Sequence, residues 1–179
     1  MKVDVKRAVW FFVVCRMSLA GRCGDFASLS RNRTRRGMNE QVSSWLGAIE
    51  GLPDIHARLK RVVVTNMDAV KLIKQQDGPH TLFYCDPPYV HEARSSTGEY
   101  GDFEMTLEQH QELLEVLAVI KGKFILSGYH NPLHDHWAEE HGFRCVEIEI
   151  DNKASSKKTK DTKVECLWMN YEKPAVTRK

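Results

Sequence analysis

The residues best suited to chemistry are Asp86, Pro87, Pro88 and Tyr89, which directly follow the apolar run TLFYC at residues 81–85. Two consecutive prolines hold the backbone extended and remove two N–H donors. Backbone carbonyls and the Asp86 carboxylate are thereby left side by side as hydrogen-bond acceptors. An amino group is the chemical complement of such acceptors, so we interpret the segment as an amine-binding site at the end of a strand.

An amine held between two acceptors can become reactive. The exocyclic amine of adenine is a poor nucleophile, because its lone pair is delocalised into the ring. Acceptors on both hydrogens favour the pyramidal geometry that localises this pair, and they aim the nitrogen at a sulfonium methyl group. The ring of Tyr89 suits a base that has left the duplex and lost its stacking neighbours. The alternative interpretation is a turn after a strand, with Tyr89 packed on the core.

From residue 61 onward, short apolar runs alternate with amphipathic ones. This alternation predicts an α/β fold with a largely parallel sheet covered on both faces, ending in an antiparallel edge hairpin. In such sheets ligands bind beyond the carboxyl ends of the strands, which is where D-P-P-Y falls. We predict strands at 61–66, 81–85, 123–127, 145–150 and 164–170, and helices at 68–75, 107–120 and 133–141.

The first 60 residues are organised differently. Residues 6–17 are apolar and bulky, and their periodicity does not decide between a buried helix and a buried strand. Capping and turn residues set the elements that follow. We predict a loop over residues 20–37, a helix capped by Asn39 that runs to Ala48, and a helix over residues 52–60 with Pro53 near its start.

Composition excludes several classes of protein. Of 179 residues, 42% are hydrophobic and 28% charged, as in soluble globular proteins, and no apolar run approaches the ~20 residues of a membrane span. The five cysteines form no C-x-x-C pair, so neither a disulfide framework nor a zinc site is indicated. His134, His136 and His141 lack the H-E-x-x-H spacing and fit a surface helix. We expect a cytoplasmic protein that binds no metal and no membrane.

The net charge of +2 is too small to indicate nucleic acid by itself, but the basic residues are clustered. One cluster lies in SRNRTRRG at residues 30–37, and the other in NKASSKKTKDTK at residues 152–163. Such runs are commonly solvated faces, and contact with nucleic acid is the alternative.

The motif and its surroundings resemble the DNA adenine methylase family, amino-methyltransferases whose catalytic motif is D-P-P-Y. The family pattern has a strand into D-P-P-Y, an aromatic-rich loop, a helix with a histidine, a strand ending in Ser and a closing strand ending in Asn-Tyr. This chain has LFYCDPPY at 82–89, EYGDFEMTLEQHQELLEVL at 99–117, FILSGYH at 124–130 and VECLWMNY at 164–171. The resemblance implies part of a Rossmann-like S-adenosylmethionine-dependent methyltransferase sheet, preceded by a small helical target-recognition region.

The resemblance also implies an activity, namely methyl transfer from S-adenosylmethionine to the exocyclic amine of a flipped adenine in double-stranded DNA. The catalytic residues would be those of D-P-P-Y at positions 86–89. Cofactor contacts would come from Asn66, Asp68 and Asp86. For Asp68, capping of the helix that starts there is the alternative.

The N-terminal part is similar to the family's recognition region, in which a basic Arg-Gly loop lies against DNA, and this favours a helix for residues 6–17. The chain would then divide into a recognition region at 1–60, a catalytic α/β half at 61–172 and a tail at 173–179. The residues that we expect to contact phosphates or base edges are Arg31, Arg33, Arg35, Arg36, Asn39, Lys157, Lys158 and Lys160.

Tyr100 and His110 follow the motif where the family places residues that line the substrate site. A histidine on the surface of a helix is the alternative for His110. We therefore do not assign His110 to catalysis.

The chain departs from the family in one respect. A complete member carries an F-x-G-x-G cofactor loop before the recognition region, and Gly21 and Gly24 do not have its spacing. We expect that the N-terminal cofactor-binding half is missing, as in a fragment, a truncated prophage gene product or one half of a two-chain enzyme. Alternative functions are an RNA guanine amino-methyltransferase and a catalytically inactive DNA-binding module. The sequence leaves three biological roles open, namely restriction-modification, phage self-protection and regulatory marking.

Overall fold

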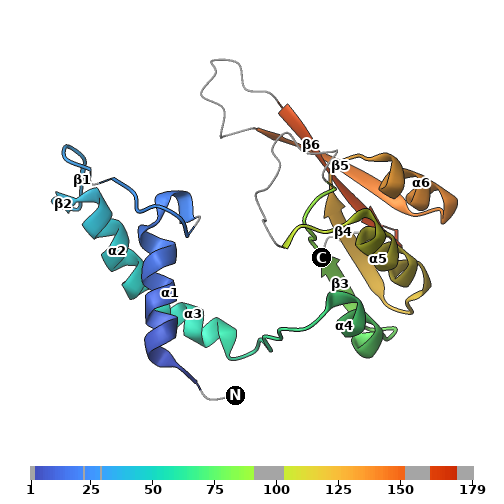
Figure 1. Ribbon diagram of the computed structural model, residues 1–179, viewed down its shortest axis with the longest axis horizontal. Helices are drawn as coiled ribbons and strands as arrows, with labels where there is room; N and C mark the ends of the chain where they lie inside the picture. The colour runs from blue at the N-terminus through green and yellow to red at the C-terminus, as the bar shows by residue number, and fades with distance from the viewer. Residues whose placement is uncertain (1–2, 22, 29, 91–102, 152–161, 173–179) are drawn as a thin grey trace, which may run out of the picture. The chain divides into compact units, whose positions relative to one another are not determined.

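The computed structural model of the chain describes residues 3–21, 23–28, 30–90, 103–151 and 162–172. The chain divides between Thr65 and Asn66 into two compact units (Figure 1). None of the described helices has both the length and the apolar character needed to cross a membrane.

The described residues of the first unit form three α-helices. Asp4 caps the first of them, because its carboxylate accepts a hydrogen bond from the Arg7 N–H at 2.9 Å. The rings of Phe12 and Trp45 pack 5.6 Å apart and join the first two helices. The helices are α1 (Val5–Met17), α2 (Glu40–Glu50) and α3 (Leu52–Leu59). The helical interpretation of residues 6–17 is confirmed.

Burial of α1, by contrast, is not observed. Trp10 and Phe11 are exposed, and no side chain of the helix is fully buried. The helix is apolar on several sides, whereas its ring contact with α2 occupies only the side that carries Phe12. The apolar run therefore predicted the helix correctly, but the predicted burial of the helix was wrong.

The described residues between 20 and 37 form more regular structure than the predicted loop. A short 3-10 helix, η1 (Leu19–Gly21), is followed by an antiparallel hairpin of β1 (Thr34–Arg35) and β2 (Met38–Asn39). The two residues of its turn, Arg36 and Gly37, have φ angles of 56° and 72°. Two positive φ angles in a two-residue loop are typical of a type I′ turn, the connection that matches strand twist, and glycine adopts this conformation at little cost.

The predicted cap of α2 is confirmed. The Asn39 side-chain oxygen accepts a hydrogen bond from the Gln41 N–H at 2.9 Å, and the Asn39 amide donates to the Ser30 carbonyl at 2.6 Å. Both ends of this side chain thus bind the local backbone. Pro53 lies in the first turn of α3, as predicted.

The strand predicted at residues 61–66 is wrong. Val63 and Val64 are 88% and 84% exposed, and the segment belongs to neither sheet. A strand persists only when its N–H and C=O groups pair with a neighbour, and none of the described strands pairs with this segment. A β-branched run supplies propensity, but pairing requires a partner at the right place.

The second unit is an α/β unit, and its described residues form one four-stranded mixed sheet. Strand order is β3-β4-β6-β5, in which β3 and β4 are parallel and the other pairs antiparallel. The sheet is therefore not largely parallel, although the predicted edge hairpin is confirmed as β5 and β6. The elements are α4 (Ala69–Gln76), β3 (Leu82–Cys85), α5 (Leu107–Val119), β4 (Lys123–Gly128), α6 (Pro132–Glu140), β5 (Arg144–Asp151) and β6 (Thr162–Met169).

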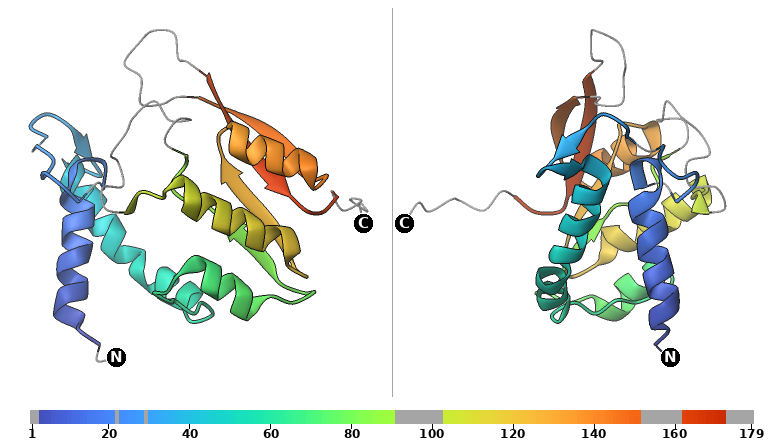
Figure 2. Two further views of the ribbon diagram at one scale, coloured as in Figure 1. Left: turned by 45° about the vertical axis from the view of Figure 1, so that its right-hand side comes forward. Right: turned by 90° about the vertical axis from the view of Figure 1, so that its left-hand side faces the viewer.

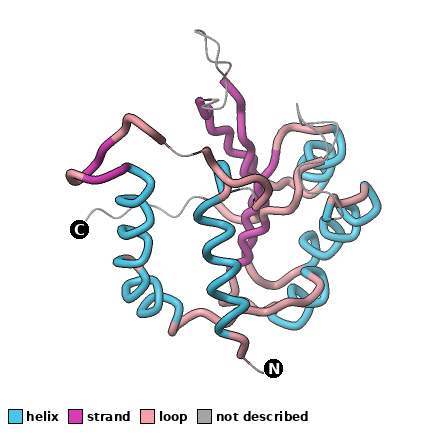
Figure 3. Tube along the Cα trace, turned by 60° about the vertical axis from the view of Figure 1, so that its left-hand side comes forward, coloured by secondary structure: helices cyan, strands magenta, loops and turns pink. Residues whose placement is uncertain are grey.

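Helices α4, α5 and α6 lie side by side on one face of this sheet (Figure 2 and Figure 3). Phe124, Leu126 and Trp168 of the strands pack under these helices in one core cluster. Strand alternation sends Leu82 and Tyr84 of β3 to the opposite face, where both are exposed. Within the described part of this unit, helices thus cover one face of the sheet, whereas cover on both faces was predicted.

His134, predicted to lie on a surface helix, and His110, for which a helix surface was one alternative, are both buried. His110 on α5 and His134 on α6 are 0% and 2% exposed, and their rings lie 5.4 Å apart. His134 also meets Trp168 edge to face at 5.1 Å. Both histidines lie on the core-facing side of amphipathic helices. Because histidine is a polar residue, the sequence pattern does not mark these positions as part of the apolar face.

Burial gives His134 a pH dependence that can be measured. Desolvation, with a smaller contribution from His110, lowers the pKa of His134 to about 4 from its usual 6.5. Well above pH 6.5 the ring is neutral in both the folded and the unfolded chain. As the pH falls from about 6.5 toward 4, only the unfolded chain takes up the proton, so we expect roughly 3 kcal/mol of stability to be lost in this window.

Urea unfolding of the wild type and of His134→Gln between pH 7.5 and 4 measures this loss. The slope of the unfolding free energy against pH should be shallower in His134→Gln. His136→Gln, on the exposed side of the same helix, should keep the wild-type slope. Equal slopes in wild type and His134→Gln would contradict the assignment.

Candidate active site

The D-P-P-Y segment lies where two parallel strands end together. Cys85, the last residue of β3, pairs in register with Leu126 of β4. Because the strands run in the same direction, residues 86–89 leave the sheet beside residues 127–129. The parallel pair thereby brings two polar strand ends to one edge of the sheet.

Tyr89 is anchored there through its hydroxyl group. Its oxygen lies 2.9 Å from Ser127 Oγ, and the hydroxyl donates a hydrogen bond to the Glu165 carboxylate. Ser127 also donates to Glu165, at 3.2 Å. Burial raises the pKa of Tyr89, and the hydrogen bond to Glu165 raises it further, so the phenol stays protonated as a donor.

The ring of Tyr89 is fixed by a second contact. Tyr129 meets it edge to face, with the ring centroids 4.8 Å apart. Ser127 and Glu165 alternate along their strands with the buried residues Leu126 and Cys166, so this group faces away from the helix-covered core. Tyr89 is therefore held in a polar network at the strand end, rather than packed in the core.

A pocket of about 430 Å³ opens beside Asp86, between α4, the end of β3 and α5. Its size is within the range of small-molecule sites. Three carboxylates, those of Asp68, Asp86 and Glu112, lie on its wall. Apolar side chains stand among them, including Phe83 and Leu113. The pocket therefore combines hydrogen-bond acceptors with flat apolar surface.

The residues predicted to bind a cofactor are only partly brought together. Asp68 lines the pocket and also caps α4, because its Oδ1 accepts from the Lys71 N–H at 2.9 Å. Asn66 is exposed and does not line this pocket. Cys85 lines it as a neutral thiol, since burial raises its pKa to about 11.

The arginine cluster lies on and beside the hairpin of the first unit. Arg33 and Arg36 form exposed ion pairs with Glu40 and Glu50, at 3.7 and 3.1 Å. A pocket of about 380 Å³ in this unit is lined in part by Arg16, Arg35 and Arg36. Arg31 is exposed in a bend before β1, while Lys157, Lys158, Lys160 and Tyr100 lie outside the described residues.

Two residues of the site, Glu165 and Tyr129, were not predicted from the sequence. Glu165 stands in the apolar strand VECLWM, and a carboxylate at such a position is a signal for a buried polar partner. The partner itself, Tyr89, is distant along the chain. Tyr129 directly follows the strand end FILSG, where polar and aromatic residues line ligand sites.

A mixed sheet with helices and a D-P-P-Y motif at a strand end fits the class of α/β methyltransferases. The family model for D12 class N6 adenine-specific DNA methyltransferases matches residues 16–154. The chain belongs to this family, which indicates methylation of adenine in DNA and confirms the resemblance found in the sequence. No curated protein matches the chain.

Proposed function

We propose that the chain transfers a methyl group from S-adenosylmethionine to the exocyclic amine of an adenine flipped out of duplex DNA. The observation that carries this proposal is the exposed Asp86 carboxylate at the end of β3, between an anchored Tyr89 and a pocket of small-molecule size. In this arrangement an amine at Asp86 has an aromatic ring on one side and a cofactor-sized space on the other.

Asp86 and the neighbouring backbone carbonyls accept the hydrogens of the target amine. The prolines at 87 and 88 keep that backbone extended, so the acceptors need no reorganisation when the base enters. Tyr89 offers its ring face to the base, and base–aromatic stacking contributes about 1–3 kcal/mol. Ser127 and Glu165 position that ring by holding its hydroxyl.

The pocket beside Asp86 fits the cofactor by the chemistry of its lining. Carboxylates accept hydrogen bonds from hydroxyl groups and favour a sulfonium cation, while Phe83 and Leu113 offer apolar surface to a nucleoside ring. Asp68 uses Oδ1 for its cap, so its other oxygen is the one that would hold the cofactor. Bound there, S-adenosylmethionine supplies an electrophilic methyl group.

DNA contact is assigned to the arginines of the hairpin, Arg31, Arg33, Arg35 and Arg36. Exposed ion pairs such as those to Glu40 and Glu50 contribute little, so a phosphate can replace either carboxylate. The Asn39 side chain already binds backbone at both ends, and a DNA contact there requires those bonds to be exchanged.

The test is a methylation assay with labelled S-adenosylmethionine, followed by mass spectrometry of the nucleosides. Unmethylated duplex DNA should yield N6-methyladenine, and structured RNA should yield no methylated base. Cofactor and DNA binding are measured on the same preparation by calorimetry. Methylguanine in RNA would replace the proposal with the RNA alternative, and DNA binding without cofactor binding would identify a non-catalytic DNA-binding module.

A further inference from the structure

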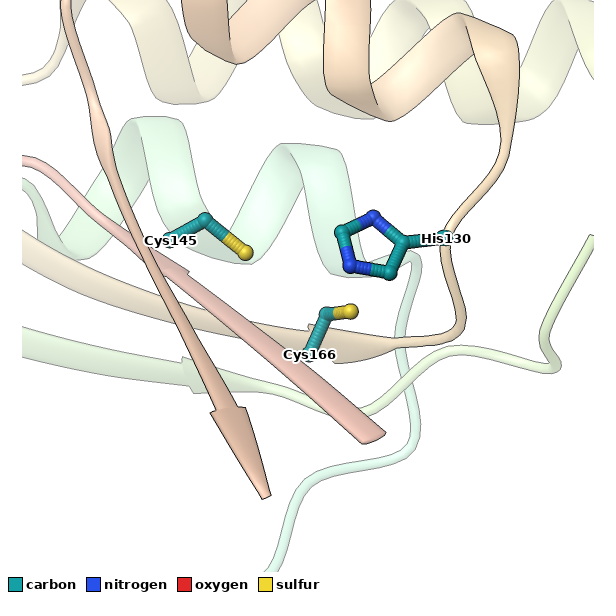
Figure 4. Close-up of side chains that lie close together, drawn as sticks. All are labelled: His130, Cys145 and Cys166. Carbon is teal, nitrogen blue, oxygen red and sulfur yellow. The ribbon is translucent and has the colours of Figure 1, made fainter. Parts of the chain in front are cut away.

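Three side chains that the proposed activity does not use converge on one space in the second unit. They are His130, Cys145 and Cys166, and their ligand atoms all lie within 4.8 Å of one another (Figure 4). His130 comes from the connection between β4 and α6, Cys145 from β5 and Cys166 from β6. Three separate elements of the fold therefore supply one cluster of nitrogen and sulfur donors.

Strand register explains why the two sulfurs meet. Cys145 pairs with Trp168, and Glu147 pairs with Cys166, in the antiparallel ladder of β5 and β6. Residues two apart share a face, so Cys145, Glu147 and Cys166 all project toward the face that α6 covers. The register thus adds a carboxylate to the two thiols.

The imidazole of His130 is oriented by two carboxylates. Its Nδ1 lies 2.9 Å from Asp135 Oδ1, and its Nε2 lies 3.3 Å from Glu147 Oε1. A histidine that ligates a metal usually has its other ring nitrogen bound to a carboxylate in this way. The shorter bond to Asp135 fixes the ring and leaves Nε2 to the metal, with Glu147 close enough to follow as an oxygen ligand.

We propose that Cys145, Cys166, His130 and Glu147 form a structural Zn²⁺ site. Thiolate and imidazole donors select zinc over magnesium or calcium, which prefer oxygen. In tetrahedral zinc sites, bonds of about 2.0–2.3 Å put the ligand atoms roughly 3.3–3.8 Å apart. The ligand atoms of His130, Cys145 and Cys166 are up to 4.8 Å apart, and rotation of the exposed His130 and Cys145 side chains would close this spacing. Glu147 is exposed as well, and its Oε1, 3.3 Å from His130 Nε2, would complete the set by turning toward the ion.

Such a site ties together the elements that flank the candidate active site. The metal would join β5 to β6 and hold the segment after β4 against both. His130 directly follows Tyr129, whose ring packs on Tyr89. Four protein ligands leave no open position, which is the arrangement of structural rather than catalytic zinc. The inference does not depend on the proposed methyl transfer, and it goes against the expectation from the sequence that the chain binds no metal.

The experiment measures metal on the full chain, purified without added zinc. Elemental analysis should find one zinc per chain. After chelation, titration with Co²⁺ should produce the thiolate-to-cobalt charge-transfer band and tetrahedral ligand-field bands at one equivalent. Zinc affinity follows from competition with a chromophoric chelator. Rebinding of zinc should also raise the Tm.

Variants separate this site from the other cysteines. Cys145→Ser and His130→Ala, both at exposed positions, should each lose the bound zinc and the cobalt spectrum of the wild type. Asp135→Asn should weaken zinc binding by roughly 10- to 100-fold, because it removes the carboxylate that orients the imidazole. The matched control is the double variant Cys15→Ser/Cys23→Ser, which removes two sulfurs 3.3 Å apart in the first unit and should keep the metal.

Several results would overturn the proposal. These are a wild type that binds neither metal, metal retained in Cys145→Ser or His130→Ala, and metal lost in the control. A disulfide between Cys145 and Cys166 would also overturn it. This bond would be sought by mass spectrometry of unreduced protein that was expressed in the reducing cytosol of a bacterial host. Circular dichroism and cooperative unfolding confirm that each variant is folded, and if Cys145→Ser does not fold, His130→Ala decides.

Discussion

Replacing Asp86 with asparagine is expected to lower kcat/KM for methyl transfer to duplex DNA by roughly 100- to 1000-fold, the range found when one preorganised hydrogen-bonding group is removed. Asparagine has nearly the same shape, but one acceptor oxygen becomes an NH2 donor that faces the hydrogens of the target amine. The interaction that activates the amine becomes a repulsion. This corresponds to about 2.7–4 kcal/mol of transition-state stabilisation.

Single-turnover rates with labelled cofactor, together with the Kd values for DNA and cofactor, test this expectation. The loss should lie mainly in kcat, since the lost interaction acts on the reacting nitrogen. Asp54→Asn, an exposed site on α3 with the same charge change, is the control and should keep the wild-type rate. A wild-type rate in Asp86→Asn would remove Asp86 from the mechanism.

Replacing Phe124 with alanine should lower the free energy of unfolding of the second unit by about 3–5 kcal/mol. Phe124 is 0% exposed and lies on β4, one of the two inner strands of the sheet. Its ring meets Phe143 edge to face at 5.2 Å and lies 5.6 Å from Trp137. Alanine would leave a cavity beneath α6 that the surrounding rings fill only in part.

Urea denaturation followed by circular dichroism measures the change, with the m-value as a check that the transition is comparable. Phe103→Ala removes the same side chain where it is 83% exposed, and its effect should stay within about 0.5 kcal/mol. Similar small changes at both positions would show that Phe124 is not part of a close-packed core.

Local features of this fold were predictable from the sequence, because the forces that set them act within a few residues. Asn39 and Asp68 cap helices at the predicted positions, and the strand TLFYC ends directly before D-P-P-Y. Caps, hydrophobic period and proline geometry are all contained in short stretches of chain. The family resemblance was found from the same kind of local pattern, and the family model that matches residues 16–154 confirms it.

The sequence by itself thus determined the helices, most of the strands, the motif and the family. Only the tertiary structure decided the mixed strand order, the loss of the strand predicted at 61–66, and the partners of the site residues. Tyr89 meets Glu165, and His130 meets Cys145 and Cys166, through strand register that no sequence spacing encodes. Contacts between residues that are far apart in the sequence depend on which strands lie side by side. Strand order is determined by the pairing and packing of the whole unit rather than by local residue preferences.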